Sequence, residues 1–408
     1  MHRERLSMPF EVSEAFLQKH QVVAVLTGGT EGKFVQLVKE GLIDLKKPVY
    51  LVVSGHSNSL AASLEILSYI RQHNGTGRVL DKGQSDEGPS DEGQSDEVLS
   101  DEVLSDEVPS DEVPSDEVPS DEVPSDEVPS DEVPSDEVPS DKVLSTKEGV
   151  SIEPSEYVLK SAQPLRLGVV GFPSDWLVSS LVDYKQVLER MNCELVDIPI
   201  EEVTSLGEVD PGMKGAEAIY ERLKEIVSRY DLQGVTLRCF DLLTTVKNTG
   251  CIALSKLNDE GIPAACEGDI PTLLTMMVCK RLTGELCFQV NPARIHADGE
   301  MLFAHCTLPL GMTEKHEYTT HFESGIGVAI HGELPSGAYT LVKLSGDLKR
   351  MLAADVELER CQYEENLCRT QVWIKATPEL AQYFLTDPIH NHHVLIKGHH
   401  AGKFKIKN

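Results

Sequence analysis

A five-residue acidic repeat divides this chain of 408 residues and limits where folded structure can form. From Ser85 to Ser140 the unit recurs twelve times and settles into SDEVP. One Val per unit offers almost no apolar surface to offset a backbone entropy of about 1–2 kcal/mol per ordered residue, and the recurrent Pro blocks helix and central strand alike. We therefore expect residues 81–145 to form a disordered, extended linker inserted between two folded stretches.

If the repeat is only a tether, deleting residues 81–145 and joining the ends with a short Gly/Ser link should leave any activity intact. The melting temperature, followed by circular dichroism against the full chain, should shift by only a few degrees. Aggregation of the shortened chain would contradict this. Because each Ser precedes two acidic residues, the alternative of a kinase-modified or partner-binding arm stays open.

Most of the negative charge lies in this repeat. The whole chain has 67 acidic and 37 basic residues, a formal net charge of −30. Residues 81–145 carry −22 of it, which leaves only −8 for the other 343 residues. Such a balance argues against binding to nucleic acid.

The chain also lacks the signs of a membrane or secreted protein. No stretch reaches the roughly 18 apolar residues that cross a bilayer, and the first residues carry no apolar leader segment. The nine cysteines are odd in number and form no C-x-x-C pair, which indicates reduced thiols. We expect a cytoplasmic protein.

The folded stretches alternate short apolar runs with amphipathic segments, a pattern typical of parallel sheets flanked by helices. This predicts an α/β fold with two Rossmann-like domains, 1–80 and 146–295, followed by a β-rich domain, 296–408. The expected strands of the α/β part are 22–27, 49–55, 165–173, 193–200, 234–240 and 262–268, and the helices between them are 33–45, 59–73, 179–192, 215–230 and 248–261. GGTEG (Gly28–Gly32) is interpreted as a turn from strand to helix, with a phosphate cradle as the alternative.

The last domain changes to short β-rich runs separated by Gly, Pro and Asp, which favours an antiparallel sheet or a small barrel. Its expected strands are 301–310, 318–324, 327–334, 338–345, 370–376 and 393–398.

The first candidate site lies where a strand delivers two carboxylates to the start of a helix. Glu267 and Asp269 precede Pro271, a residue that favours the first helical turn. The alternative is that Asp269 only caps the helix. Since ligands of parallel sheets bind beyond the carboxyl ends of the strands, Arg238, Asp241 and Glu267 are expected on one rim.

The second candidate site is rich in histidine. DPIHNHHVLIKGHH (Asp387–His400) crowds five imidazoles into one segment, and imidazoles bind divalent transition metals. Because neighbouring strand residues point to opposite faces, only one of His392 and His393 can enter a given site. His305, His321 and Glu323 add polar groups inside apolar runs, where burial demands partners.

Several motifs in the second half of the chain are similar, also in their order, to those of one family. The chain resembles the L-fucose isomerase/L-arabinose isomerase superfamily, most densely over residues 234–400. The motifs that carry the resemblance are CEGDIPTLLTMM, NPARI, FAHCTLPLGM, THFESGIGVAI, LCRTQVWIK and NHHVLIKG. The acidic repeat has no counterpart in that family.

The resemblance implies aldose–ketose isomerisation of an open-chain monosaccharide through an enediol, with a divalent metal, usually Mn²⁺. It assigns Glu267 as metal ligand and base, His393 as the late metal ligand, and His305 as a histidine of the arabinose branch. The family's second carboxylate is missing, since Val290 or Asn291 stands there. Asn291 can still offer an amide oxygen to the metal.

These assignments define the predicted site. Glu267 and Asp269 are the expected catalytic residues, and the expected substrate-binding residues are Arg238, His305 and Glu323. The resemblance also implies a homo-oligomer. Two other functions stay open: a protein of this fold that binds a sugar or sugar phosphate without isomerising it, and an interaction protein that acts through its acidic repeat.

Overall fold

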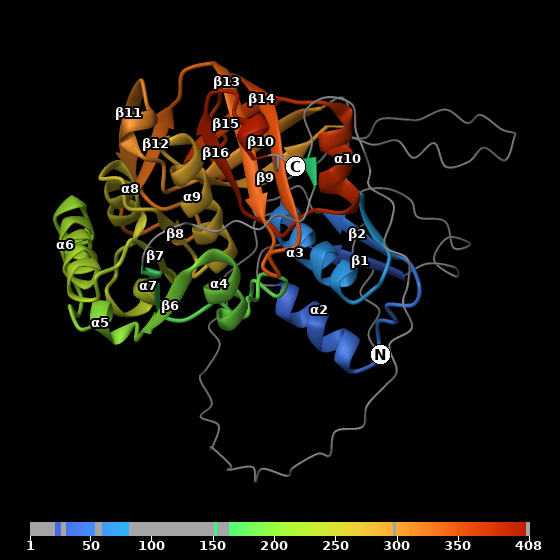
Figure 1. The fold of residues 1–408 in the computed structure, drawn as a ribbon, viewed down its shortest axis with the longest axis horizontal. Coiled ribbons are helices and arrows are strands. Elements are labelled where there is room, and N and C mark those ends of the chain that lie inside the picture. The colour runs from blue at the N-terminus through green and yellow to red at the C-terminus, as the bar shows by residue number, and fades with distance from the viewer. Residues whose placement is uncertain are drawn as a thin grey trace, which may run out of the picture. The chain divides into compact units, whose positions relative to one another are not determined.

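The computed structural model describes residues 21–25, 30–53, 59–80, 151–152, 163–296 and 299–404 (Figure 1). The expected linker at 81–145 lies outside these residues, and so do Gly28 and Gly29 of the candidate phosphate turn. Helix α2 (Thr30–Lys39) already includes the rest of that turn.

The first sheet contains three parallel strands in the order β1-β2-β3, as the alternation predicts. Its strands are β1 (Gln21–Val25), β2 (Val49–Val53) and β3 (Gly77–Leu80). Helix α3 (Ser59–Gln72) connects β2 to β3 and is buried along almost its whole length. A helix that is apolar nearly all round needs cover on more than one side, and α3 also contacts the C-terminal part of the chain.

The second sheet contains four parallel strands in the order β6-β5-β7-β8. Its strands are β5 (Leu165–Val170), β6 (Cys193–Ile198), β7 (Gly234–Leu237) and β8 (Ala264–Cys266). The helices around it are α4 (Tyr184–Met191), α5 (Glu201–Thr204), α6 (Met213–Arg229), α7 (Asp241–Thr245), α8 (Cys251–Asp259) and α9 (Ile270–Thr283). Helix α4 begins later than the expected residue 179, because the Asp183 carboxylate caps it by accepting the Lys185 N–H at 2.8 Å.

The C-terminal region closes into a six-stranded antiparallel barrel, which confirms the predicted β-rich part. The strands run β13-β16-β9-β10-β15-β14, and β14 pairs back with β13. They are β9 (Phe288–Ile295), β10 (Glu300–His305), β13 (Gly337–Leu344), β14 (Met351–Cys361), β15 (Thr370–Lys375) and β16 (His393–Lys397). The β-rich part therefore begins with β9, before the expected boundary at 296.

Smaller elements surround the barrel. The short β4 (Ser151–Ile152) adds to the edge of β14. The strands β11 (Lys315–Thr319) and β12 (Ala329–Glu333) form a separate hairpin, and α10 (Pro378–Thr386) precedes β16. Two single 3-10 turns, Leu310–Met312 and Ala401–Lys403, complete the described elements.

Helix α9 joins the parallel sheet to the barrel (Figure 1). It contacts β7 and β8 on one side and β13 and β16 on the other. Leu273, Leu274 and Met277 are among its many buried apolar side chains. The packing of α9 therefore brings Glu267, in the turn after β8, close to β16, the barrel strand that follows the histidine-rich turn.

All nine cysteines, each within the described residues, are free thiols. Among the described helices, none combines the length and the apolar character needed to cross a bilayer.

Buried His390 should make the stability of the protein fall in acid. Its Nδ1 and the Ser179 hydroxyl are 2.9 Å apart, and the Gly346 N–H donates to its Nε2 at 2.9 Å. Burial, followed by the charge of Lys343, lowers the pKa of His390 to about 3. The unfolded chain binds this proton below about pH 6.5 and the folded chain does not, so stability is lost as the pH falls from there toward 3.

The variant His390→Asn removes this titration and suits the left-handed backbone of the site (φ 56°). Urea unfolding at pH 7, 6 and 5 should show that wild type loses about 1.4 kcal/mol more per pH unit than the variant below pH 6. Equal pH slopes for the two proteins would contradict the prediction.

Candidate metal centre

The turn after β8 carries Glu267 in an unusual backbone conformation. Glu267 and Gly268 both adopt the left-handed region, with φ of 62°. Position 268 requires glycine, since a Cβ there would lie 2.9 Å from the Phe172 carbonyl oxygen. The Ser174 hydroxyl donates to the Glu267 carbonyl oxygen, and the Gly268 N–H donates to the Leu237 carbonyl oxygen at 2.9 Å. These bonds hold a strained residue of the kind that clusters at functional sites.

Glu267 meets two histidines from distant parts of the chain. One ligand atom each from Glu267, His305 and His392 lies within 4.8 Å of the other two. Glu267 Oε1 is 3.4 Å from His392 Nε2 and 4.0 Å from His305 Nε2. Ligand atoms on an ion at about 2.1 Å are roughly 3.0–3.4 Å apart, so a small contraction would let the three share one cation.

The other ring nitrogens orient both imidazoles toward the cluster. His392 Nδ1 lies 2.8 Å from Asp269 Oδ2, while its Nε2 is buried and has no hydrogen-bond partner among the described residues. His305 Nδ1 lies 2.9 Å from the Thr307 hydroxyl. In the tautomers with a proton on Nδ1, both Nε2 atoms are free to bind a metal, which is the arrangement of carboxylate–histidine–metal triads.

The electrostatics prepare two of the three ligands. Burial raises the pKa of Glu267, but the charge and hydrogen bond of His392, with smaller effects of His305 and Trp176, together hold it below its ordinary value. Burial and the charge of His392 lower the pKa of His305 to about 4. Glu267 is therefore ionised and His305 neutral at pH 7, as metal ligands must be.

His392 differs from His305. Burial opposes its charge, but Glu267 and the bond to Asp269 together raise the pKa of His392 to about 9. Without a metal, both ring nitrogens of His392 are protonated and the ring is positively charged. A bound cation would have to displace the proton on Nε2.

Asp269 has both oxygens engaged. Its Oδ1 accepts the Thr272 N–H at 2.7 Å and caps α9, and its Oδ2 contacts His392. The capping alternative is thus seen in the structure, together with a second role in orienting His392. An Asp with both oxygens occupied is poorly placed to accept a proton from a substrate.

His393, the expected late ligand, points elsewhere. Its Nε2 is 3.1 Å from the Tyr383 hydroxyl and its Nδ1 is 2.9 Å from the Asn391 carbonyl oxygen. His393 begins β16 and pairs with Val290, so the preceding residue projects in the other direction. The structure places His392, not His393, beside Glu267.

Asn291 lies on β9 and pairs with Ala304 of β10. Ala304 is the residue before His305. It is 5% exposed, and its Oδ1 has no hydrogen-bond partner among the described residues. A buried amide oxygen without a partner suits the role of an additional metal ligand, as expected for this position.

The other expected site residues lie around the cluster. Arg238 pairs with Asp175 at 3.1 Å and Asp241 at 3.2 Å, and its guanidinium stacks over Trp176. Trp176 in turn donates to Glu267 Oε2 at 3.3 Å. Arg238 therefore reaches the cluster through Trp176, a residue that no sequence motif indicated.

Glu323 lies in the turn between β11 and β12, and its side chain is exposed. The pKa of Glu323 is raised, in part by the negative charge of Glu267.

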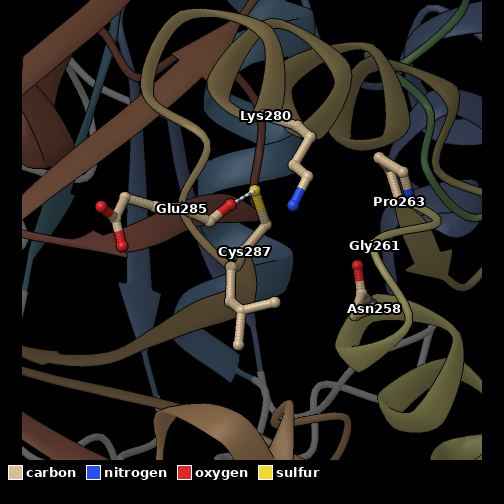
Figure 2. A pocket seen from close by; sticks show the side chains of 7 residues that line it. Asn258, Gly261, Pro263, Lys280, Glu285 and Cys287 are labelled. Carbon is tan, nitrogen blue, oxygen red and sulfur yellow. Dashed lines mark hydrogen bonds between the residues drawn. The ribbon is translucent and has the colours of Figure 1, made fainter.

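A surface pocket elsewhere offers no comparable chemistry (Figure 2). It lies between Lys280, near the end of α9, and Cys287, just before β9. Since α9 is about 20 Å long, this pocket is at the opposite end of the helix from Glu267. Its Lys280 ammonium already donates to the Gly284 carbonyl oxygen at 3.2 Å.

No protein-family model and no curated protein matches the chain.

Proposed function

We propose that this protein is a divalent-metal-dependent aldose–ketose isomerase, acting on an open-chain monosaccharide in the manner of L-fucose and L-arabinose isomerases. The observation that carries the proposal is the buried cluster of Glu267, His305 and His392. One carboxylate and two imidazoles suit Mn²⁺, Fe²⁺, Co²⁺ or Zn²⁺, and the resemblance favours Mn²⁺. When bound, such a cation would polarise the sugar carbonyl and stabilise the negative charge that develops on its oxygens.

The two oxygens of Glu267 have different surroundings. Oε1 faces the two imidazoles, whereas Oε2 accepts the Trp176 N–H at 3.3 Å. Oε1 is thus the metal ligand, and Oε2, held by the indole, is the base that takes the proton from sugar C2 and returns it to C1.

The hydroxyl proton needs a second group, because no second carboxylate stands at Val290 or Asn291. Glu323 is our candidate for this role, since its pKa is raised and the negative charge of Glu267 contributes to that shift. A protonated carboxyl group can donate to the oxygen at which the carbonyl is lost and take the proton of the other hydroxyl. Arg238 remains our proposed substrate contact, whereas His305 joins the proposed metal ligands.

Metal analysis of the purified protein, followed by a screen of aldoses for ketose formation in D₂O, tests the proposal. We expect about one Mn²⁺ per chain after loading, and deuterium at C2 of at least one aldose. Failure to bind any divalent cation would overturn the metal centre.

The main alternative is a protein that binds a sugar or sugar phosphate without isomerising it. The missing second carboxylate and the two occupied oxygens of Asp269 favour it. Tight sugar binding without deuterium exchange would select this alternative.

We also propose a homo-oligomer, as the resemblance implies, and a cytoplasmic location, as the reduced thiols indicate. Sedimentation velocity of the full chain would measure its oligomeric state.

A further inference from the structure

Lys343 is a charged residue in the interior of the protein. It lies on β13, in the apolar run AYTLVKLS, and its side chain is fully buried. Lysine is almost never fully buried unless it is paired, because an unpaired ammonium loses its hydration. The described contacts show how this cost is offset.

The Lys343 ammonium binds the start of α9. It donates to the Thr272 hydroxyl at 2.8 Å and lies 3.6 Å from Asp269 Oδ2. The same Asp269 oxygen contacts His392 Nδ1 at 2.8 Å. Lys343 and His392 therefore share one buried carboxylate oxygen.

Both oxygens of Asp269 face donors. Oδ1 accepts the Thr272 N–H at 2.7 Å, and Oδ2 lies between the Lys343 ammonium at 3.6 Å and His392 Nδ1 at 2.8 Å. A carboxylate oxygen accepts and does not donate, so this contact requires a proton on His392 Nδ1. Nε2 is then the nitrogen that faces Glu267.

A second buried carboxylate extends the network to the N-terminal sheet. Glu65 of α3 accepts the Ser179 N–H at 2.7 Å and the Ser180 hydroxyl at 3.1 Å. Burial lowers the pKa of Lys343 below its ordinary value, and the charges of Asp269 and Glu65 oppose that shift.

We propose that Lys343 is a positioning residue of the metal centre: through Asp269 it fixes the tautomer and orientation of His392, with Nε2 free for the cation. This inference rests on the proposed metal centre. Lys343 contacts no ligand atom of the cluster in the described structure, so any effect on metal binding has to pass through Asp269. A purely structural ion pair between β13 and α9 would instead affect only stability.

The test compares Mn²⁺ affinity in Lys343→Met and wild type, using the EPR signal of free Mn²⁺. Met keeps the length of the side chain and removes the charge. Loss of a residue that orients a metal-bound histidine typically costs 10–100-fold in affinity, and we expect that loss here. The Co²⁺ absorption spectrum should also change. Lys256→Met, which breaks the pair with Glu217 between α8 and α6, is the matched control and should leave both readouts unchanged.

A double-mutant cycle with Asp269→Asn separates the possible results. If Lys343 acts through Asp269, adding Lys343→Met to Asp269→Asn should weaken Mn²⁺ binding by less than about threefold. If Lys343→Met alone does not fold, this comparison decides, because the double variant removes both members of the Lys343–Asp269 pair. Two results would overturn the inference. One is a Mn²⁺ affinity of the double variant tenfold below that of Asp269→Asn, and the other is wild-type Mn²⁺ affinity in a folded Lys343→Met. Absence of Mn²⁺ binding in wild type would overturn the proposed metal centre and this inference with it.

Discussion

Glu267→Gln is expected to abolish isomerisation, with deuterium exchange at sugar C2 falling by at least about 1,000-fold. The amide keeps the shape of the side chain but cannot accept the C2 proton, and a positioned base contributes about 10²–10⁴-fold. The variant also loses one negative charge from the metal centre, so Mn²⁺ affinity should fall as well. The measurement is the rate of C2 exchange in D₂O with saturating Mn²⁺, which separates the loss of the base from the loss of metal.

Glu333→Gln provides the matched control for this experiment. Glu333 is exposed on β12 and pairs with Lys315 at 3.5 Å, so the same chemical change there should leave exchange unaffected. Equal exchange in Glu267→Gln and wild type would remove Glu267 from the mechanism. Absence of exchange in wild type with every aldose would favour the protein that only binds a sugar.

His392→Gln should weaken Mn²⁺ binding by more than about 100-fold, whereas His393→Gln should leave it within a few-fold of wild type. Loss of a ligand should exceed the 10–100-fold cost of losing a residue that only orients one. His392 Nε2 faces Glu267, while both ring nitrogens of His393 contact other groups, at Tyr383 and Asn391. The two neighbours therefore serve as controls for each other.

Titration calorimetry with Mn²⁺ on both folded variants checks this pair. His393→Gln should lower the melting temperature, because the Tyr383 hydroxyl loses its contact with the His393 ring in the core. This loss of stability should not be accompanied by weaker metal binding. The reverse result, with loss of metal in His393→Gln only, would support the ligand that the family resemblance implied and contradict the geometry of the cluster.

Local sequence patterns predicted much of the fold. Continuous apolar runs such as VYLVV and LRLGVV indicated the buried parallel strands, and both are strands in the structure. The β-rich character after α9 was also predicted. β14 was missed although Asp355, Glu357 and Glu359 alternate with apolar residues there, the usual pattern of a half-buried strand.

The candidate site was predicted only in part. Glu267 and His305 could be proposed because polar residues interrupt apolar runs at both positions, and both belong to the cluster. Trp176 carries no local signal, since its contact with Glu267 spans 91 positions. Lys343 did carry one, as the only charged residue in AYTLVKLS, but its partners lie on another element.

The sequence by itself determined where strands and helices form and which residue types are available for metal chemistry, because periodicity, caps and turns act over a few neighbouring residues. Only the tertiary structure decided which of these residues meet. His392 and His393 are chemically identical neighbours, and the register of β16 against β9 turns one toward Glu267 and the other toward Tyr383. That choice depends on strand pairing and on the packing of α9 against the barrel, which join residues more than 100 positions apart and leave no local trace in the sequence.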